Sequence, residues 1–221
     1  ILGFYKYYSF SISLISKLGI DIPIRIIKNS QSIIIPLGIS FICFTMLAFL
    51  IDMYRRKINK LPSISDFFLF NLFFPKLASG PITRFESFQN ELLNHKSDAV
   101  KNITFGLNRF AIGLGKKVLI ADVLAVSVSK VFNSDYVNLS IPILWIAALG
   151  FMMQIFFDFS GYTDMAIGLA KIFGINLPEN FNQPYLATSI QDFWRRWHIT
   201  LSSWFRDYLY IPLGGSRVKP N

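Results

Sequence analysis

The densest group of polar side chains in this sequence lies in its last third, where a histidine follows two arginines. The phrase Asp192-Phe-Trp-Arg-Arg-Trp-His198 carries a carboxylate, two guanidinium groups and an imidazole within seven residues. On a helix Asp192 would reach Arg195 and Arg196, and Arg195 and Trp194 would lie near His198. Neighbouring cations favour a neutral imidazole, which is the form that a general base needs near neutral pH. His198 is therefore either an active-site base or a structural histidine.

Two acids form a second candidate group, directly after an apolar run. Asp158 and Asp164 lie in the phrase Phe-Asp-Phe-Ser-Gly-Tyr-Thr-Asp-Met. Acids at such depth in a membrane protein usually face a cavity or a partner. On a helix Asp158 shares a face with Tyr162, whereas Asp164 projects elsewhere. The two acids either tie helices together or act directly in the site.

A loop rich in turn-forming residues separates these two groups and covers residues 174–185. Its Asn180 and Asn182 side chains can hydrogen-bond to backbone or to substrate carbonyl groups. We expect this loop to fix the position of the helix after it. That helix is predicted to begin after Ser189, because Asp192 stands at the spacing of a capping box, and to continue through His198 to Phe205. Three tryptophans within eleven residues of this helix suit a membrane interface.

The composition indicates a membrane protein. Hydrophobic residues make up 52% of the 221 residues, charged residues 16%, and 23 residues are phenylalanine. A soluble globule of this size could not bury so much apolar surface. The net charge of +9 comes from short clusters such as Tyr54-Arg55-Arg56-Lys57, not from the basic stripe that nucleic-acid binding requires. The lipid bilayer is thus the expected partner, and nucleic acid is excluded.

Two uncharged runs of 19 residues, 33–51 and 139–157, have the length needed to cross a hydrocarbon core of roughly 30 Å. Residues 1–18 predict a third span, with lysines near its ends. Residues 67–82 contain two prolines, which predicts a kinked or re-entrant segment. Residues 105–131 carry two central lysines, which predicts an interfacial helix or two short helices that turn at Gly113 and Gly115.

Other kinds of site find little support. There is no Gly-x-Ser-x-Gly elbow and no Walker phosphate loop, and Gly113-Leu-Gly115 lacks the third glycine of a dinucleotide site. The single Cys43 has no partner cysteine, and two distant histidines do not make a metal cluster. No metal site is therefore expected, and His95 is interpreted as a solvated surface residue.

These motifs are similar to those of the membrane-bound O-acyltransferase family. The chain resembles that family in Pro178-Glu-Asn-Phe-Asn-Gln-Pro-Tyr185, in the phrase from Asp192 to His198, and in Leu201-Ser-Ser-Trp-Phe-Arg-Asp-Tyr-Leu-Tyr-Ile-Pro-Leu-Gly-Gly215. Residues 36–41, 74–81, 113–122 and 156–168 add further matches. The branch it resembles is the alginate O-acetyltransferase type, and the Ile-Pro-Leu-Gly-Gly ending favours acetylation over D-alanylation.

The resemblance implies an all-α, polytopic helix bundle in the plasma or inner membrane, with residues 1–221 as one membrane-embedded domain that is incomplete at both ends. It implies transfer of an acetyl group from a co-substrate, acetyl-CoA or an acyl carrier, to hydroxyls of an exported polysaccharide or cell-wall polymer. No bound cofactor is expected. Acetylation partner proteins in the periplasm or outside the cell are implied as well.

The resemblance and the local patterns together name the candidate site. His198 is the candidate catalytic residue, and supporting or substrate-binding roles fall to Asn180, Asn182, Asp192, Trp194, Arg195, Arg196, Arg206, Asp207, Asp158 and Asp164. The family's usual catalytic histidine lies in a Trp-His-Gly-like motif that would follow Asn221. By that resemblance His198 is expected to assist or position, and residues 1–221 alone are expected to be inactive.

Two other functions stay open on the sequence alone. A transporter or flippase for an acyl donor or a polymer precursor would also use intramembrane acids and lysines, but it would not need a second histidine after Asn221. A membrane scaffold without catalysis would tolerate replacement of His198 and Asn180.

Overall fold

The computed structural model describes residues 2–18, 23, 36–58, 61–93, 98–135 and 139–217. Within these residues the secondary structure is helical apart from one isolated antiparallel bridge, between Phe181 and Trp197. The expected all-α class is confirmed. The α-helices are α1 (Leu2–Lys17), α3 (Ile39–Tyr54), α4 (Ile64–Leu72), α5 (Phe74–Leu77), α6 (Phe85–Leu93), α7 (Ala99–Gly115), α8 (Asp122–Phe132), α9 (Ile141–Ile172), α10 (Ile190–Arg196) and α11 (Ile199–Phe205). Shorter turns are the π-helical η1 (Lys116–Ala121) and η4 (Arg206–Tyr210) and the 3₁₀-helical η3 (Pro184–Leu186) and η5 (Gly215–Arg217).

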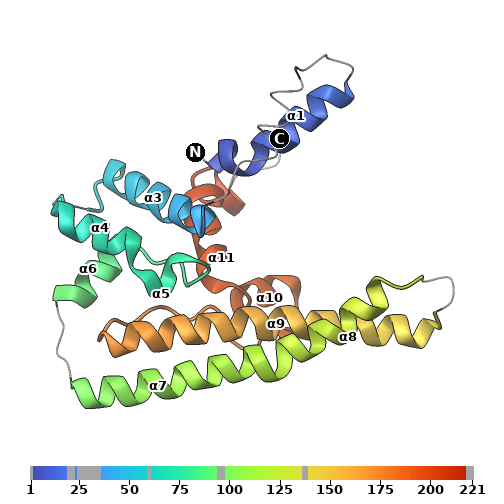
Figure 1. Ribbon diagram of the computed structural model, residues 1–221. Coiled ribbons are helices and arrows are strands. Elements are labelled where there is room, and N and C mark those ends of the chain that lie inside the picture. The colour runs from blue at the N-terminus through green and yellow to red at the C-terminus, as the bar shows by residue number, and fades with distance from the viewer. Residues whose placement is uncertain are drawn as a thin grey trace.

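The helices form two groups with α10 and α11 between them (Figure 1). Helices α7 and α9 lie side by side along one edge of the molecule, and α3 to α6 form the second group (Figure 1). Helices α10 and α11 lie between the two groups, and α1 extends away from them (Figure 1). The loop and the histidine singled out by the sequence therefore lie where the two groups meet.

Glycines allow α7 and α9 to approach backbone to backbone. A Cβ added at Gly113 would lie 2.5 Å from the carbonyl oxygen of Gly161, and one added at Gly106 would lie 2.5 Å from that of Gly168. Each helix presents its two glycines seven residues apart, two turns along the same face. Such small-residue contacts let helices pack closely in lipid, where hydrophobic burial supplies little driving force between helices.

Phenylalanines join α9 to the second helix group. Phe49, Phe70, Phe73, Phe85 and Phe88 are buried together with Ile167, Ala170, Ile175 and Leu177. The rings of Phe70 and Phe85 meet edge to face with centroids 5.2 Å apart, which is a favourable aromatic geometry. This cluster fixes α3, α4 and α6 against the C-terminal end of α9.

Helix α9 confirms the predicted run of residues 139–157 and extends it to 32 residues. Within the described residues it is the helix with the length and apolarity to cross a membrane, and 6% of its apolar window is buried. Exposed side chains such as Trp145, Ile146 and Leu149 would be poorly solvated in water. The N-terminal run forms the 16-residue α1, which confirms a helix there.

The membrane span predicted over residues 33–51 differs in its bounds from the helix that forms there. Helix α3 begins at Ile39, after Gly38, whose φ is +71° and where a Cβ would lie 2.0 Å from the carbonyl oxygen of Leu77. Only glycine fits this close approach in a left-handed conformation, so the helix cannot start earlier. Residues 33–35 and His95 lie outside the described residues.

The two segments predicted to be irregular have different outcomes. The break expected within residues 67–82 is confirmed: α4 ends at Leu72, and Phe73 leaves the helical conformation before α5 begins. Of the two alternatives for residues 105–131, the turn at Gly113 and Gly115 is wrong, and the interfacial helix stays a prediction. Gly115 and Lys116 keep right-handed helical angles, and the chain continues through the π-helical η1 into α8.

The glycine contact gives a prediction with a control on the same helix. Gly113→Ala places a methyl group against the α9 backbone, so it should destabilise the protein by about 1–3 kcal/mol. Gly115→Ala meets no atom within 4 Å and should be neutral or stabilise by up to about 1 kcal/mol through helix propensity. Thermal unfolding of the full-length protein in detergent compares them, and equal midpoints for both variants would contradict the proposed packing.

Candidate active site

A sharp break separates α10 from α11 at the candidate histidine. The N-cap prediction is confirmed, since the Ser189 side chain accepts a hydrogen bond from the Asp192 backbone N–H at 3.1 Å. The predicted continuous helix to Phe205 is wrong, because Trp197 is extended and His198 is left-handed with φ 44° and ψ 54°.

The loop of residues 174–183 supplies the physical reason for this break. The Asn182 N–H donates to the Arg196 carbonyl at 2.9 Å, and the Ile199 N–H donates to the Asn180 carbonyl at 3.0 Å. These two bonds engage backbone groups that a continuous helix would use within itself. The expectation that the loop positions the segment after it is thereby confirmed.

The side chain of Asn180 lies at the centre of the site and has no exposed surface. Its Oδ1 atom accepts hydrogen bonds from the Thr200 backbone N–H at 3.1 Å and from the Thr200 hydroxyl at 2.7 Å. The Nδ1 atom of His198 lies 3.3 Å from the same oxygen. The bond from the backbone N–H identifies this atom as the amide carbonyl oxygen, which has no proton to donate, so Nδ1 carries the proton and Nε2 carries the lone pair.

Burial keeps His198 neutral. The residue is 8% exposed, and its ring meets Phe159 edge to face at 4.7 Å and stacks over Phe41 at 6.5 Å. Loss of solvent lowers the pKa of His198 from 6.5 to about 4. The expected neutral form is confirmed, but the expected cause is wrong: the apolar setting lowers the pKa, while Trp194 and Arg195 are exposed.

A cavity of about 440 Å³ lies beside this group of hydrogen bonds. Thr200 lines the cavity, and its hydroxyl also accepts a hydrogen bond from the Ile82 N–H at 3.1 Å. Its lining combines polar, charged and aromatic side chains, among them Thr83, Arg84, Glu91, Ser203, Trp204 and Arg206. This size and this mixture of lining groups are typical of a small-molecule site.

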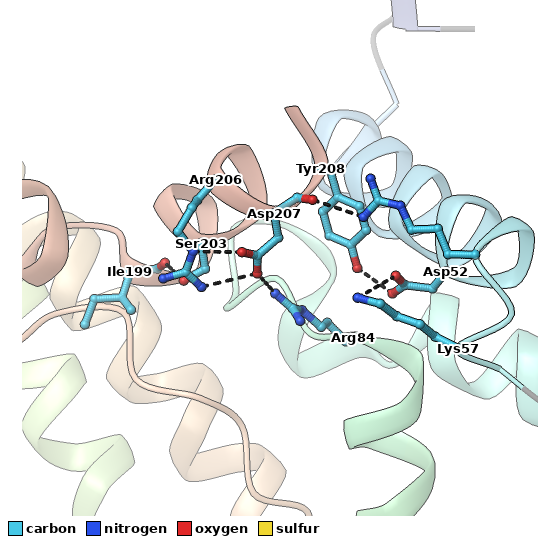
Figure 2. Close-up of polar contacts among 9 residues, drawn as sticks. Asp52, Lys57, Arg84, Ile199, Ser203, Arg206, Asp207 and Tyr208 are labelled. Atoms are coloured by element: carbon cyan, nitrogen blue, oxygen red, sulfur yellow. Dashed lines mark hydrogen bonds and ion pairs between the residues drawn. The ribbon is translucent and has the colours of Figure 1, made fainter. Parts of the chain in front are cut away.

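Asp207, predicted from the sequence, lies between two arginines at the edge of the cavity. Figure 2 shows its carboxylate facing Arg206 on one side and Arg84 on the other, with an Arg206 Nε–Oδ1 distance of 2.7 Å. The hydrogen bond from Arg206, followed by that from Arg84, lowers the pKa of Asp207. A carboxylate held in this way orients both guanidinium groups beside the cavity.

Neighbouring contacts connect Asp207 and Tyr208 to the end of α3. Arg55 donates to the Asp207 carbonyl at 3.0 Å, and the Tyr208 hydroxyl donates to Asp52, which Lys57 also approaches at 3.7 Å (Figure 2). The η4 segment is therefore held by both side-chain and backbone groups.

The remaining predicted residues lie apart from this arrangement. Asp192 pairs with Arg196 at 2.9 Å, as its spacing predicts, and the Asn182 side chain is exposed. Asp158 pairs with Lys117 at 2.7 Å. Asp164 pairs with Arg109 of α7 and Lys116 of η1, so both acids bond to η1 and Asp164 also bonds to α7. This geometry supports the helix-tying alternative for both carboxylates.

Sequence reasoning missed three residues of the site: Thr200, Phe159 and Arg84. Thr200 lies 20 positions from Asn180 and Arg84 lies 123 positions from Asp207, so no local pattern predicts either contact. Phe159 follows Asp158 directly, but its apolar side chain gives no sign of a contact with His198 in the sequence.

Comparisons with known proteins agree on one family. The family described as MBOAT, membrane-bound O-acyltransferase family, matches residues 53–221. The probable alginate O-acetylase AlgI of Pseudomonas aeruginosa is 41% identical over 98% of this chain and 41% of its own length. The peptidoglycan O-acetyltransferase of Helicobacter pylori is 40% identical over 99% of this chain and 45% of its own length. The teichoic acid D-alanyltransferase of Bacillus subtilis is 34% identical over 79% of this chain and 45% of its own length. The chain thus spans less than half the length of these curated relatives.

The hydrogen bonds of Thr200 give a stability prediction. Thr200→Val leaves the Asn180 side-chain carbonyl without one donor and the Ile82 N–H without its acceptor, which should lower the unfolding free energy by about 1–3 kcal/mol. Thr200→Ser keeps the hydroxyl and should lose less than half as much. Chemical denaturation of the full-length protein in detergent measures both, and a loss for Thr200→Ser as large as that for Thr200→Val would show that the methyl group contributes at least as much as the hydroxyl.

Proposed function

Because the chain belongs to the membrane-bound O-acyltransferase family, we propose that the protein transfers an acetyl group from an activated donor to hydroxyls of an exported polysaccharide or cell-wall polymer. The support comes from relatives named alginate O-acetylase and peptidoglycan O-acetyltransferase, both at about 40% identity over nearly the whole chain. The D-alanyltransferases match less of the chain and at lower identity, which favours an acetyl group over a D-alanyl group.

The observation that carries the proposal is the buried pair of Asn180 and His198. The Asn180 oxygen, 3.3 Å from Nδ1, holds the imidazole in the tautomer whose Nε2 can accept a proton. Burial keeps that nitrogen unprotonated at neutral pH. A neutral, oriented imidazole is what removal of a proton from a sugar hydroxyl requires.

The chemistry uses these groups in turn. In this proposal His198 is the base itself, and not only an aid to the histidine that the family resemblance places after Asn221. The acceptor hydroxyl gives its proton to Nε2 of His198 as its oxygen attacks the acyl carbonyl carbon. The tetrahedral intermediate then collapses, the bond between carbon and the leaving sulfur breaks, and the imidazolium returns the proton to the thiolate. A thioester donor is already activated, so the protein contributes mainly a base and the alignment of the two reactants.

The cavity is lined by Thr200, which bonds to Asn180, and not by Asn180 or His198 themselves; we propose that it holds one reactant next to this pair. Its lining includes the apolar side chains of Phe88 and Trp204 and the guanidinium groups of Arg84 and Arg206. We propose that these supporting residues orient the reactant, with Asp207 holding both guanidinium groups in place.

The family makes this a membrane protein. We propose a multi-pass helix bundle in the plasma or inner membrane, in which residues 1–221 belong to one membrane-embedded domain. Support comes from the exposed apolar side chains of α9, and from the 16-residue apolar helix α3. We also propose acetyl-CoA or an acyl carrier as donor, and acetylation proteins outside the membrane as partners.

Replacement of His198 tests the proposed function. In cells without their own polymer acetylation, His198→Ala in the full-length protein should lower polymer acetyl content roughly 10²-fold or more at equal membrane abundance. His95→Ala, the other histidine of the chain, should leave it unchanged. Normal acetylation by His198→Ala would show that the buried pair of Asn180 and His198 has no role in transfer. A wild type that adds no acetyl would favour transport of the donor or polymer instead.

The pH dependence of transfer depends on the lowered pKa of His198. A base acts in its neutral form, so activity is present above its pKa and is lost as the pH falls through it. With a pKa near 4, transfer should stay constant between pH 7.5 and about 5.5, where an ordinary histidine of pKa 6.5 would already be mostly protonated. Transfer rates in membrane vesicles measure this, and a loss centred near pH 6.5 would contradict the buried setting.

A further inference from the structure

One guanidinium group connects the α7–α9 pair to the loop that carries Asn180. Arg109 on α7 donates through Nε to Asp164 Oδ1 of α9 at 2.8 Å, and its Nη2 lies 2.7 Å from the same oxygen. The same Nη2 lies 2.7 Å from Glu179 Oε2. Glu179 directly precedes Asn180 in the chain.

Other contacts hold the two ends of the loop. At its start, Asn176 hydrogen-bonds to Glu91 of α6 at 2.6 Å. At its end, Asn182 bonds to the backbone of Arg196. Glu179 lies between these points, and its ion pair with Arg109 ties the middle of the loop to the α7–α9 pair. This contact adds to the bonds from Ile199 and Thr200 that hold Asn180 itself.

The position of Asn180 matters because its contact with His198 is long. The Nδ1–Oδ1 distance is 3.3 Å, and a separation of about 3.6 Å is no longer a hydrogen bond. A shift of a few tenths of an ångström would therefore release the imidazole to its other tautomer, whose Nε2 carries a proton and cannot act as a base.

We propose that Arg109 is a positioning residue that acts through Glu179 to hold Asn180 against His198. This inference rests on the proposed function. Arg109 supports transfer without touching a reactant, and Asp164 serves as the fixed point on α9 that orients the guanidinium group. The side chain of Asp164 is 7% exposed, whereas that of Glu179 is 53% exposed.

Lys116 offers a matched control. It pairs with the other oxygen of Asp164 at 2.6 Å, and its side chain is 28% exposed, as is that of Arg109. Replacement of either residue removes one partner from the same buried carboxylate. Only Arg109 also holds Glu179 among the described ion pairs.

The experiment compares Arg109→Gln, Glu179→Ala and Lys116→Gln in the full-length protein. Membranes receive [14C]acetyl-CoA, and acetyl incorporation into polymer gives the maximal rate per mole of protein and the KM for acetyl-CoA. Arg109→Gln and Glu179→Ala should lower the maximal rate roughly 10-fold or more with an unchanged KM. Lys116→Gln should keep the wild-type rate.

Thermal midpoints should instead fall for Arg109→Gln and Lys116→Gln, and stay near wild type for Glu179→Ala.

Several outcomes would overturn the inference. A wild-type rate for Glu179→Ala, or an equal loss of rate for Lys116→Gln, would make Arg109 a structural residue only. A raised KM with an unchanged maximal rate for Glu179→Ala would place Glu179 in donor binding instead. His198→Ala in the same assay separates the two claims. If it is inactive while the Arg109 and Glu179 variants are normal, this inference fails alone, and if it is fully active, the proposed function fails too.

Discussion

The side-chain oxygen of Asn180 accepts hydrogen bonds from groups that come after the break between α10 and α11, and it does so with no exposure to solvent. If such a bond breaks while its groups stay buried, each donor or acceptor is left without a hydrogen-bond partner, at a cost of about 1–3 kcal/mol for each group. The left-handed conformation of His198 is itself unfavourable for a residue with a Cβ. The hydrogen bonds from Thr200 and the backbone bonds to the loop offset that cost. The imidazole orientation is therefore a consequence of how the loop packs.

That loop depends in turn on the α7–α9 pair. The glycine contacts bring two backbones close enough for Asp164 to lie between Arg109 and Lys116. In the wider π-helical turn of η1, consecutive lysines both reach α9, Lys116 at Asp164 and Lys117 at Asp158. Helix α9 also supplies Phe159, whose ring lies against His198. A single helix thus provides a membrane-length apolar segment, an anchor for the loop and one wall around the imidazole.

Local patterns in the sequence predicted much of this arrangement, because local physical chemistry determines it. The cap at Ser189, the turn-rich loop, the broken segment near Pro75 and the ion pair of Asp192 with Arg196 all depend on residues a few positions apart. The break at His198 was not predictable in this way. The residues from 190 to 205 have good helical spacing, and long-range hydrogen bonds to Asn180 and Asn182 override it. The same holds for Thr200 and Arg109, whose roles depend on partners 20 and 70 positions away.

The tautomer of His198 tests the role of the buried pair most directly. Imidazole ¹⁵N chemical shifts of the full-length protein, labelled at histidine and assigned by comparison with His198→Ala, distinguish a protonated from an unprotonated nitrogen. We predict a protonated Nδ1 and an unprotonated Nε2 at pH 7, and loss of this preference in Asn180→Ala. A protonated Nε2 in the wild-type protein would contradict the proposed role, because His198 could then not accept the proton of an acceptor hydroxyl.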